Sequence, residues 1–331
     1  MSSERIQDPV EAAEGFSSAF ASIKDEISKV VVGQKDVVEQ LLISLFSGGH
    51  CVLVGVPGLA KTLLIQTVAE TMNLSFSRIQ FTPDLMPGDI TGTEVIEDDK
   101  ETGRKHFKFI KGPIFANIVL ADEINRTPPK TQAALLEGMQ EHKITASGQT
   151  FTLDDPFFVL ATQNPIEQEG TYPLPEAQLD RFMFHIHLNY PLPAEEKQIV
   201  KQTTSPQRKV IHSVLEKNRI LEFQKLIREV PVPEHVLDKT IKLVTQTRPK
   251  TEQAPEFVNK YLSWGAGPRA SQYLILGAKT RALSMGRFNV EMDDIKALAI
   301  PVLRHRIVTN YAAEAEGYTT VDIINHLLDT L

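Results

Sequence analysis

The sequence contains little cysteine and no long apolar run. A single cysteine among 331 residues excludes an internal disulfide, and the position of Cys51 in the apolar run CVLV favours a buried structural thiol. No segment approaches the roughly 18 apolar residues of a membrane-spanning helix, and the opening residues lack the apolar core of a secretory signal. We therefore expect a cytoplasmic protein without a membrane span.

Positive charge is also scarce. The formal net charge of −7 disfavours a generally basic surface of the kind that wraps nucleic acid. The densest basic stretch, Gly103–Lys111, interleaves basic residues with two phenylalanines and lies close to the acidic Glu97–Asp99. A solvated β-hairpin explains this stretch most simply, and we expect no nucleic-acid partner.

The first part of the chain alternates short apolar runs with segments of helical periodicity, such as Gln34–Phe46 and Leu63–Met72. This alternation predicts an α/β fold with a mostly parallel sheet covered by helices on both faces. Ligands bind such sheets at the carboxyl ends of the strands. The predicted strands are His50–Val54, Phe76–Phe81, Asn117–Asp122, Phe157–Asn164 and Phe182–Leu188.

The character of the sequence changes at Asn189–Glu196, where two prolines indicate a linker. Helical periodicity dominates beyond it, and the predicted helices are Val214–Val230, Pro233–Thr247, Ala270–Met285 and Asp293–Thr309. We therefore predict an αβα domain over residues 1–191 and a smaller, all-helical domain over residues 192–331.

A glycine-rich loop, GVPGLAKT from Gly55 to Thr62, joins the first predicted strand to a helix. Its glycines allow backbone N–H groups to turn toward phosphate oxygens, the helix N-terminus adds its dipole, and Lys61 neutralises charge. The Thr62 hydroxyl is of the type that coordinates Mg²⁺. The phosphate-loop pattern has glycine where this chain has Ala60, and we expect Ala60 to adopt a helical conformation, in which a methyl group costs little.

Two adjacent carboxylates, Asp122 and Glu123, follow another apolar strand. One carboxylate of such a pair can hold Mg²⁺ while the other takes a proton from an attacking water molecule, an arrangement that favours hydrolysis. The alternative is that both residues cap the following helix. Asn164 ends a further strand, where its amide could bind the attacking water and the γ-phosphate, or could serve as a turn residue before Pro165.

Two arginines also have two interpretations each. Arg181 could pair with Asp180 or reach across a subunit boundary to a γ-phosphate, where a guanidinium stabilises transition-state charge. Arg269 begins a helix of the second domain and could meet a phosphate from that side or lie on the surface. The residues themselves leave both choices open.

Six motifs, in order over nearly the whole chain, resemble the MoxR family of AAA+ ATPases: VVGQ, GVPGLAKT, LADEINRTPPKTQAALLEGMQE, ATQNP, GTYPLPEAQLDRF and GPRAS. Alanine before the lysine is itself common in that family. The resemblance implies an AAA+ nucleotide-binding domain, a helical lid, and ATP and Mg²⁺ as cofactors. It implies that the nucleotide is bound by Val32, Gly33, Gln34, Gly55, Val56, Pro57, Gly58, Leu59, Ala60, Lys61, Thr62 and Leu63.

The resemblance also implies roles for single residues. Lys61 belongs to Walker A, Asp122 and Glu123 to Walker B, Asn164 to sensor 1, Arg181 to the arginine finger and Arg269 to sensor 2, with Mg²⁺ at Thr62 and Asp122. Two inserted hairpins are implied within Met86–Pro113 and His142–Asp155, and turn residues between strand formers in both segments agree with this. We further hypothesise that Gln80 restrains Glu123 until a partner binds.

The function that the resemblance implies is Mg²⁺-dependent ATP hydrolysis by a ring, expected to be a hexamer, that remodels or matures a partner protein complex. Metal or cofactor insertion into that complex is one form of such maturation, and partners with a von Willebrand factor A domain are expected. Two alternatives stay open at this point. One is a nucleic-acid motor or metal-chelatase subunit of a related AAA+ branch, and the other is an ATP-regulated scaffold with little turnover.

Overall fold

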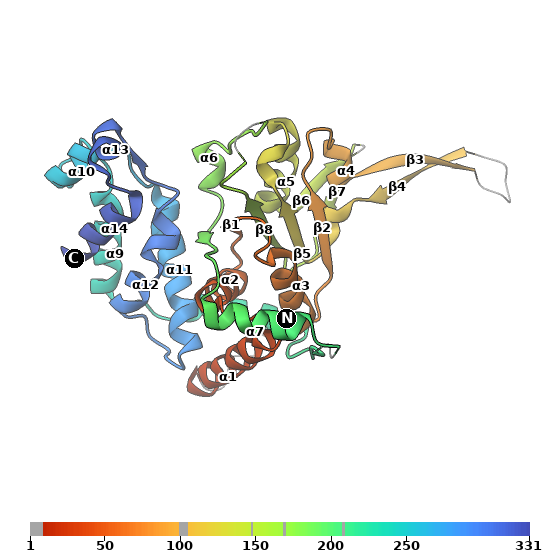
Figure 1. The fold of residues 1–331 in the computed structure, drawn as a ribbon, viewed down its shortest axis with the longest axis horizontal. Coiled ribbons are helices and arrows are strands. Elements are labelled where there is room, and N and C mark those ends of the chain that lie inside the picture. Colours follow the sequence, from red (N-terminus) through yellow and green to blue (C-terminus); the bar gives the residue numbers. More distant parts are fainter. Residues whose placement is uncertain (1–8, 99–104, 147, 168–169, 207–208) are drawn as a thin grey trace.

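A five-stranded parallel sheet forms the centre of the N-terminal part of the molecule (Figure 1). The computed structural model describes residues 9–98, 105–146, 148–167, 170–206 and 209–331. The strand order is β2-β5-β8-β1-β9, and each neighbouring pair is parallel, which confirms the predicted sheet. The strands are β1 Cys51–Val54, β2 Phe76–Gln80, β5 Ile118–Asp122, β8 Phe158–Gln163 and β9 Phe184–His187.

Both faces of this sheet are buried. In β5, Ile118 and Leu120 belong to one apolar core, whereas Val119 and Ala121 belong to another. Successive side chains of a strand point to opposite faces, so a strand covered on both sides needs a continuous apolar run. The covering helices are α1 Pro9–Ser28, α2 Lys35–Phe46, α3 Lys61–Thr71 and α8 Lys217–Glu229 on the first core and α5 Pro129–Glu141 on the second.

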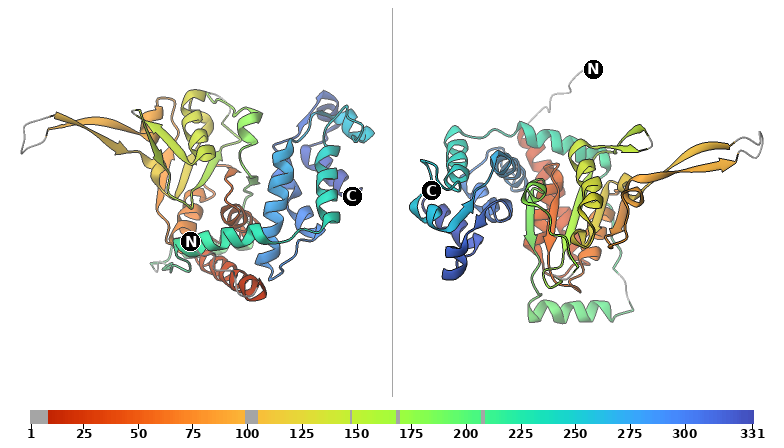
Figure 2. Two further views of the ribbon diagram at one scale, coloured as in Figure 1. Left: turned by 180° about the vertical axis from the view of Figure 1, so that it is seen from behind. Right: turned by 90° about the horizontal axis from the view of Figure 1, so that it is seen from above.

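Two hairpins leave the sheet domain, as predicted, and Figure 2 shows the first of them projecting far from the rest of the molecule. They are β3 Gly92–Asp98 with β4 Lys105–Lys111, and β6 Lys143–Ala146 with β7 Gln149–Thr152. Phe109 of the first stacks on Phe151 of the second, with ring centroids 4.4 Å apart. The basic stretch thus lies largely on an exposed strand, where Lys108 pairs with Glu97 at 2.9 Å, while Asp99, Gly103 and Arg104 lie outside the described residues.

Among its described residues, the C-terminal part is helical except for one short two-stranded ribbon. Its elements are α7 Pro193–Thr203, α9 Glu234–Gln246, α10 Glu256–Tyr261, β10 Leu262–Trp264, α11 Pro268–Ser284, α12 Met292–Leu303, β11 Val308–Thr309, α13 Tyr311–Glu316 and α14 Thr320–Asp329. The helix predicted to run to Thr309 therefore ends at Leu303, because the chain turns there and Val308 pairs with Trp264 of β10. The predicted helical domain is confirmed, and the ribbon is an addition to it, whose strands are too short to leave a periodic pattern.

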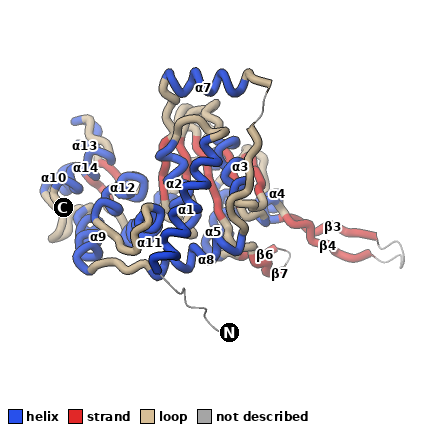
Figure 3. Tube along the Cα trace, turned by 90° about the horizontal axis from the view of Figure 1, so that it is seen from below, coloured by secondary structure: helices blue, strands red, loops and turns tan. Residues whose placement is uncertain are grey.

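Shorter elements complete the chain: α4 Pro87–Thr91, α6 Glu176–Leu179 and the 3₁₀ turns η1 Pro113–Phe115 and η2 Ile124–Arg126. Figure 3 shows α7 set apart from the other helices, and none of its residues is buried. No helix in the part of the chain that the structure describes is long and apolar enough to cross a membrane.

Candidate functional site

The phosphate loop lies between β1 and α3, at the carboxyl edge of the sheet. Gly58 has φ +85°, a left-handed conformation that glycine adopts without strain. At Gly55 a side chain is excluded by packing, because a Cβ atom there would lie 2.8 Å from the Leu188 Cβ. The two glycines are therefore required for different reasons, one for backbone conformation and the other for close packing against the end of β9.

Ala60 does not have the helical conformation that we expected from the sequence. Its φ and ψ are 54° and 32°, so this non-glycine residue is left-handed and forms the N-cap of α3, where its carbonyl accepts the Leu64 N–H at 3.0 Å. A left-handed conformation costs an L-residue about 1–2 kcal/mol. The expectation was wrong because the loop turns sharply into the helix at this residue; the glycine that the phosphate-loop pattern has at this position was the available signal.

Lys61 lies close to the acidic pair. Its Nζ atom donates a hydrogen bond to the Gly55 carbonyl at 2.6 Å, across the mouth of the loop. Partial burial lowers the pKa of Lys61, while the charges of Asp122 and Glu123 oppose that shift. A phosphate group would provide the ammonium with a stronger partner than a neutral carbonyl, so the donor set of the loop suits a polyphosphate.

Asp122 is held on both carboxylate oxygens. Arg78 Nη2 donates to Oδ2 at 2.6 Å, and Thr162 Oγ1 donates to Oδ1 at 2.6 Å. These contacts follow from strand register, because Asp122 pairs with Gln80 of β2 and lies one step beyond the pair of Ala121 with Ala161 of β8. Sequence reasoning missed Arg78 and Thr162. The available signal was strand periodicity, because Arg78 lies two residues before Gln80 and Thr162 lies two residues before Asn164, and side chains two apart on a strand share a face.

Glu123 is held in a defined position by three side chains. Its backbone is left-handed, with φ 57°, and its N–H donates to Thr162 Oγ1 at 2.9 Å. Its Oε2 atom accepts from Gln80 Nε2 at 3.0 Å and from Arg126 Nη1 at 2.9 Å. The contact hypothesised for Gln80 is therefore present, and Arg126 adds a second donor that sequence reasoning missed.

Asn164 lies directly after β8 and beside the start of the phosphate loop, where Gly55 N–H donates to the Gln163 carbonyl at 3.3 Å. The side chain is 5% exposed, and its Oδ1 accepts from Ile166 N–H at 3.2 Å. That bond is the one expected of a turn residue, yet it also orients the amide. Because the oxygens of a phosphate are acceptors, Asn164 would meet a phosphate through its Nδ2 donor.

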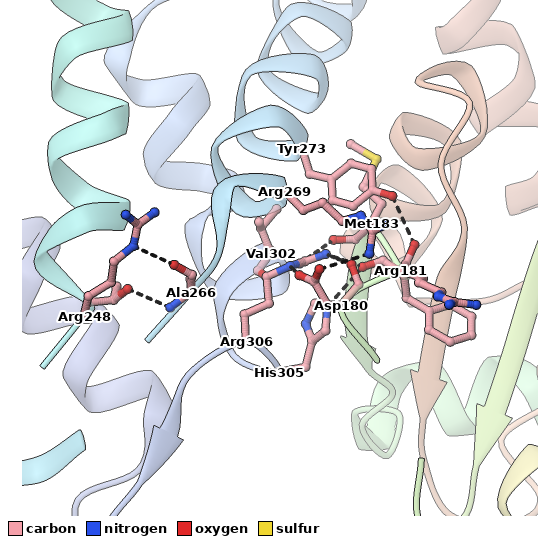
Figure 4. A network of polar contacts seen from close by, with 12 residues as sticks. Asp180, Arg181, Met183, Arg248, Ala266, Arg269, Tyr273, Val302, His305 and Arg306 are labelled. Atoms are coloured by element: carbon pink, nitrogen blue, oxygen red, sulfur yellow. Dashed lines mark hydrogen bonds and ion pairs between the residues drawn. The ribbon is translucent and has the colours of Figure 1, made fainter. Parts of the chain in front are cut away.

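The two arginines differ in their contacts, as Figure 4 shows. Asp180 pairs with Arg269 at 3.2 Å and with Arg306 at 2.8 Å. Arg181 extends away from that group, and its Nη1 donates to the Leu136 carbonyl at 3.3 Å. Of its two interpretations, the pairing of Arg181 with Asp180 is therefore not the arrangement in this structure.

The segment Val32–Gln34 leads into α2 near a pocket of about 560 Å³ between β9, α2 and α12. Gln34 lines this pocket, and its Nε2 donates to the Asn189 carbonyl at 2.8 Å. Gly33 is left-handed with φ +72°, and a Cβ there would overlap the Glu195 carboxylate. Burial lowers the pKa of His185, which also lines the pocket, to about 3, so that side chain is neutral near pH 7.

A glycine-rich loop at the end of a central parallel strand, an acidic pair on the next strand but one and a following helical domain define a P-loop ATPase of the AAA+ class. Comparison with known proteins agrees: residues 50–184 match the ATPase family associated with various cellular activities (AAA), and residues 256–327 match the AAA lid domain.

Relatives narrow this class to one family. Chaperone MoxR1 of Mycobacterium tuberculosis is 42% identical over 98% of this chain and 85% of its own length. YeaC of Bacillus subtilis is 39% identical over 93% of this chain and 92% of its own, and MoxR of Methylorubrum extorquens is 27% identical over 96% and 95%. A solved structure of a Cytophaga hutchinsonii protein assigned as an ATPase has a TM-score of 0.90 and 45% identity, covering 97% of this chain and 96% of that one. The chain belongs to the MoxR family of AAA+ ATPases.

Proposed function

We propose that this ATPase hydrolyses the β–γ anhydride of ATP at the carboxyl edge of the sheet, with Glu123 as the general base. The observation that carries the proposal is the convergence of Lys61 and the adjacent pair Asp122 and Glu123, from two separate segments, on one end of the parallel strands. Lys61 and the loop N–H groups bind the β- and γ-phosphates, and Asn164 orients the attacking water. Thr62 and Asp122 would hold Mg²⁺, which neutralises phosphate charge.

The contacts on Glu123 support a resting state in this proposal. An oxygen that already accepts hydrogen bonds from Gln80 and Arg126 is a poorer base than a free carboxylate and is not free to turn toward water. Arg78 likewise pairs with Asp122, the carboxylate that would hold Mg²⁺. Binding of nucleotide, or of a partner, would release these carboxylates for reaction.

The test of the active site compares two variants. Lys61→Ala is expected to abolish nucleotide binding, whereas Glu123→Gln is expected to bind ATP with nearly native affinity and to hydrolyse it at least 100-fold more slowly, about the lower size of a general-base contribution. Equilibrium binding of a fluorescent ATP analogue and steady-state phosphate release measure both. Unchanged turnover of Glu123→Gln would remove the general base from the proposal.

Assembly into a ring, which we propose to be a hexamer, follows from the role of Arg181. A finger that completes the neighbour's site contributes about 10³–10⁵ in rate in other NTPases. Arg181→Ala is expected to lose activity that is regained when it is mixed with Glu123→Gln, because only mixed rings contain an intact base next to an intact finger. Absence of rescue would argue against action in trans.

The client is proposed to be a protein complex that the ring remodels or matures, including by metal insertion, through a partner with a von Willebrand factor A domain. The family resemblance and the name of the mycobacterial relative, Chaperone MoxR1, support this. Capture of proteins by Glu123→Gln in the presence of ATP, which holds the ring in its loaded state, would identify the partner. Stimulation of turnover by single- or double-stranded DNA would instead favour a nucleic-acid motor, and negligible turnover of the native ring would favour a scaffold.

A further inference from the structure

The backbone around Arg181 is bound by side chains of the C-terminal helical part. Four consecutive carbonyl oxygens, those of residues 180–183, accept hydrogen bonds from that part of the chain. Tyr273 Oη of α11 donates to the Arg181 carbonyl at 3.1 Å. Arg306, which follows α12, donates to the carbonyls of Asp180, Phe182 and Met183 at 2.8, 2.6 and 3.3 Å (Figure 4).

Arg306 is buried where it makes these contacts. Its side chain is 1% exposed, and its Nε donates to the Asp180 carboxylate at 2.8 Å. A buried guanidinium is costly unless its charge is paired and its N–H groups are satisfied. Four of the five Arg306 contacts are to residues 180–183 and the fifth is to the Val302 carbonyl of α12, so the guanidinium fixes the shape of that segment against α12. His305 adds a bond from Nε2 to the Phe182 carbonyl at 3.1 Å.

The same segment also touches the proposed lid-side phosphate ligand. Arg269 Nη1 donates to the Asp180 Oδ2 atom at 3.2 Å, and Asp180 directly precedes Arg181. A displacement of α11 or α12 therefore reaches Arg181 through the backbone that these helices hold. The segment is also attached to the sheet domain: Met183 N–H donates to the His50 carbonyl at 2.7 Å, the Phe182 ring is buried in the second core, and Arg181 Nη1 donates to the Leu136 carbonyl at 3.3 Å. The carbonyl oxygens of residues 180–183, by contrast, are bound from the helical part.

We propose that Tyr273 and Arg306 are positioning residues for Arg181, so that the nucleotide state of a subunit's own lid sets how its finger is presented to the neighbouring site. The inference rests on the proposed role of Arg181 in trans. It also predicts which active site is affected: a change at Tyr273 lowers hydrolysis in the site of the adjacent subunit and not in the site of the subunit that carries the change.

Mixed rings test this direction. Glu123→Gln subunits contribute an intact finger but a dead site, and Arg181→Ala subunits contribute an intact base but no finger. Tyr273→Phe is added to one type at a time, in mixtures of equal composition, and phosphate release is compared. Tyr261→Phe is the matched control, because its hydroxyl bonds Glu316 at 2.6 Å elsewhere in the helical part.

Tyr273→Phe in the finger-contributing subunit is expected to lower the activity of the mixed ring about three- to tenfold, the equivalent of one hydrogen bond. In the Arg181→Ala subunit, Tyr273→Phe is expected to lower the activity of the mixed ring no more than about twofold. The control Tyr261→Phe is expected to lower it no more than about twofold in either type of subunit. Arg306→Lys loses the planar guanidinium. In the finger-contributing subunit it is expected to lower the activity of the mixed ring more than Tyr273→Phe does, with thermal denaturation used to check that the variant folds.

The outcomes separate the two proposals. Mixtures that show no activity before Tyr273 is changed refute the finger in trans and, with it, this inference. Active mixtures in which Tyr273→Phe costs the same in both subunits, or nothing in the finger-contributing one, leave the finger standing and refute the positioning role.

Discussion

Replacing Gln80 with alanine tests whether the resting contact on Glu123 limits turnover. Gln80 Nε2 and Arg126 Nη1 donate to the same Glu123 oxygen at 3.0 and 2.9 Å, so the substitution removes one of the two donors to that oxygen. The net free energy of a typical hydrogen bond is about 1 kcal/mol, which corresponds to a factor of about five in rate. We expect Gln80→Ala to raise partner-free turnover about fivefold, with ATP affinity within about twofold of native.

Phosphate release at saturating ATP measures the turnover, and binding of a slowly hydrolysed analogue measures the affinity. Gln66→Ala is the matched control, because Gln66 Nε2 donates to Glu70 Oε1 at 3.2 Å on the exposed face of α3, away from the carboxylates. A fall in turnover at unchanged affinity would show that Gln80 orients Glu123 for reaction instead of restraining it. That result, or equal turnover in the variant and the native protein, would refute the reasoning.

Three further predictions concern the backbone, the thiol and the histidines. Ala60→Gly relieves a left-handed strain of about 1–2 kcal/mol. Glycine also loses more conformational entropy on folding, which costs about 0.5–1 kcal/mol, so urea unfolding is expected to show up to about 1 kcal/mol of added stability. Nucleotide affinity is expected to change no more than a few fold, and a large gain in affinity would show that Ala60 impairs the loop. Burial raises the pKa of Cys51 to about 12, so mass spectrometry is expected to find it unmodified by iodoacetamide at pH 8 until denaturant is added. Burial lowers the pKa of His50 to about 4 and that of His185 to about 3, so the unfolded chain binds more protons than the folded one below about pH 6.5. The free energy of unfolding is therefore expected to fall as the pH is lowered from 6.5 toward 4, by up to about 1.4 kcal/mol per unit for each histidine, and equal stability at pH 7 and pH 5 would contradict this.

Much of the site could be predicted because its residues follow strand ends. The loop after β1, the acidic pair at the end of β5 and Asn164 after β8 are each marked by an apolar run that stops at polar residues. Parallel strands bring those ends to one edge, so order along the chain was enough to bring the residues together. Roles in binding and catalysis were then assigned from chemistry and family resemblance, and they remain predictions for the variants above to test.

The partners of those residues could not be predicted in the same way. Arg78 lies 44 positions from Asp122, and Arg306 lies 126 positions from Asp180. Their contacts depend on which strands are neighbours, on the register between them and on where α12 ends. A helix predicted to continue through Arg306 would have placed that side chain on a regular helical surface, whereas the turn after Leu303 directs it into the interface.

Residue types and their order determined that this chain forms a parallel α/β sheet with a phosphate loop, an acidic pair and a helical C-terminal part, because periodicity and strand ends are local properties. Tertiary structure alone decided the left-handed backbone of Glu123, the restraint of both carboxylates and the attachment of Arg181 to the helical part. These features depend on distances between segments far apart in the chain, which are set only when both faces of the sheet are packed.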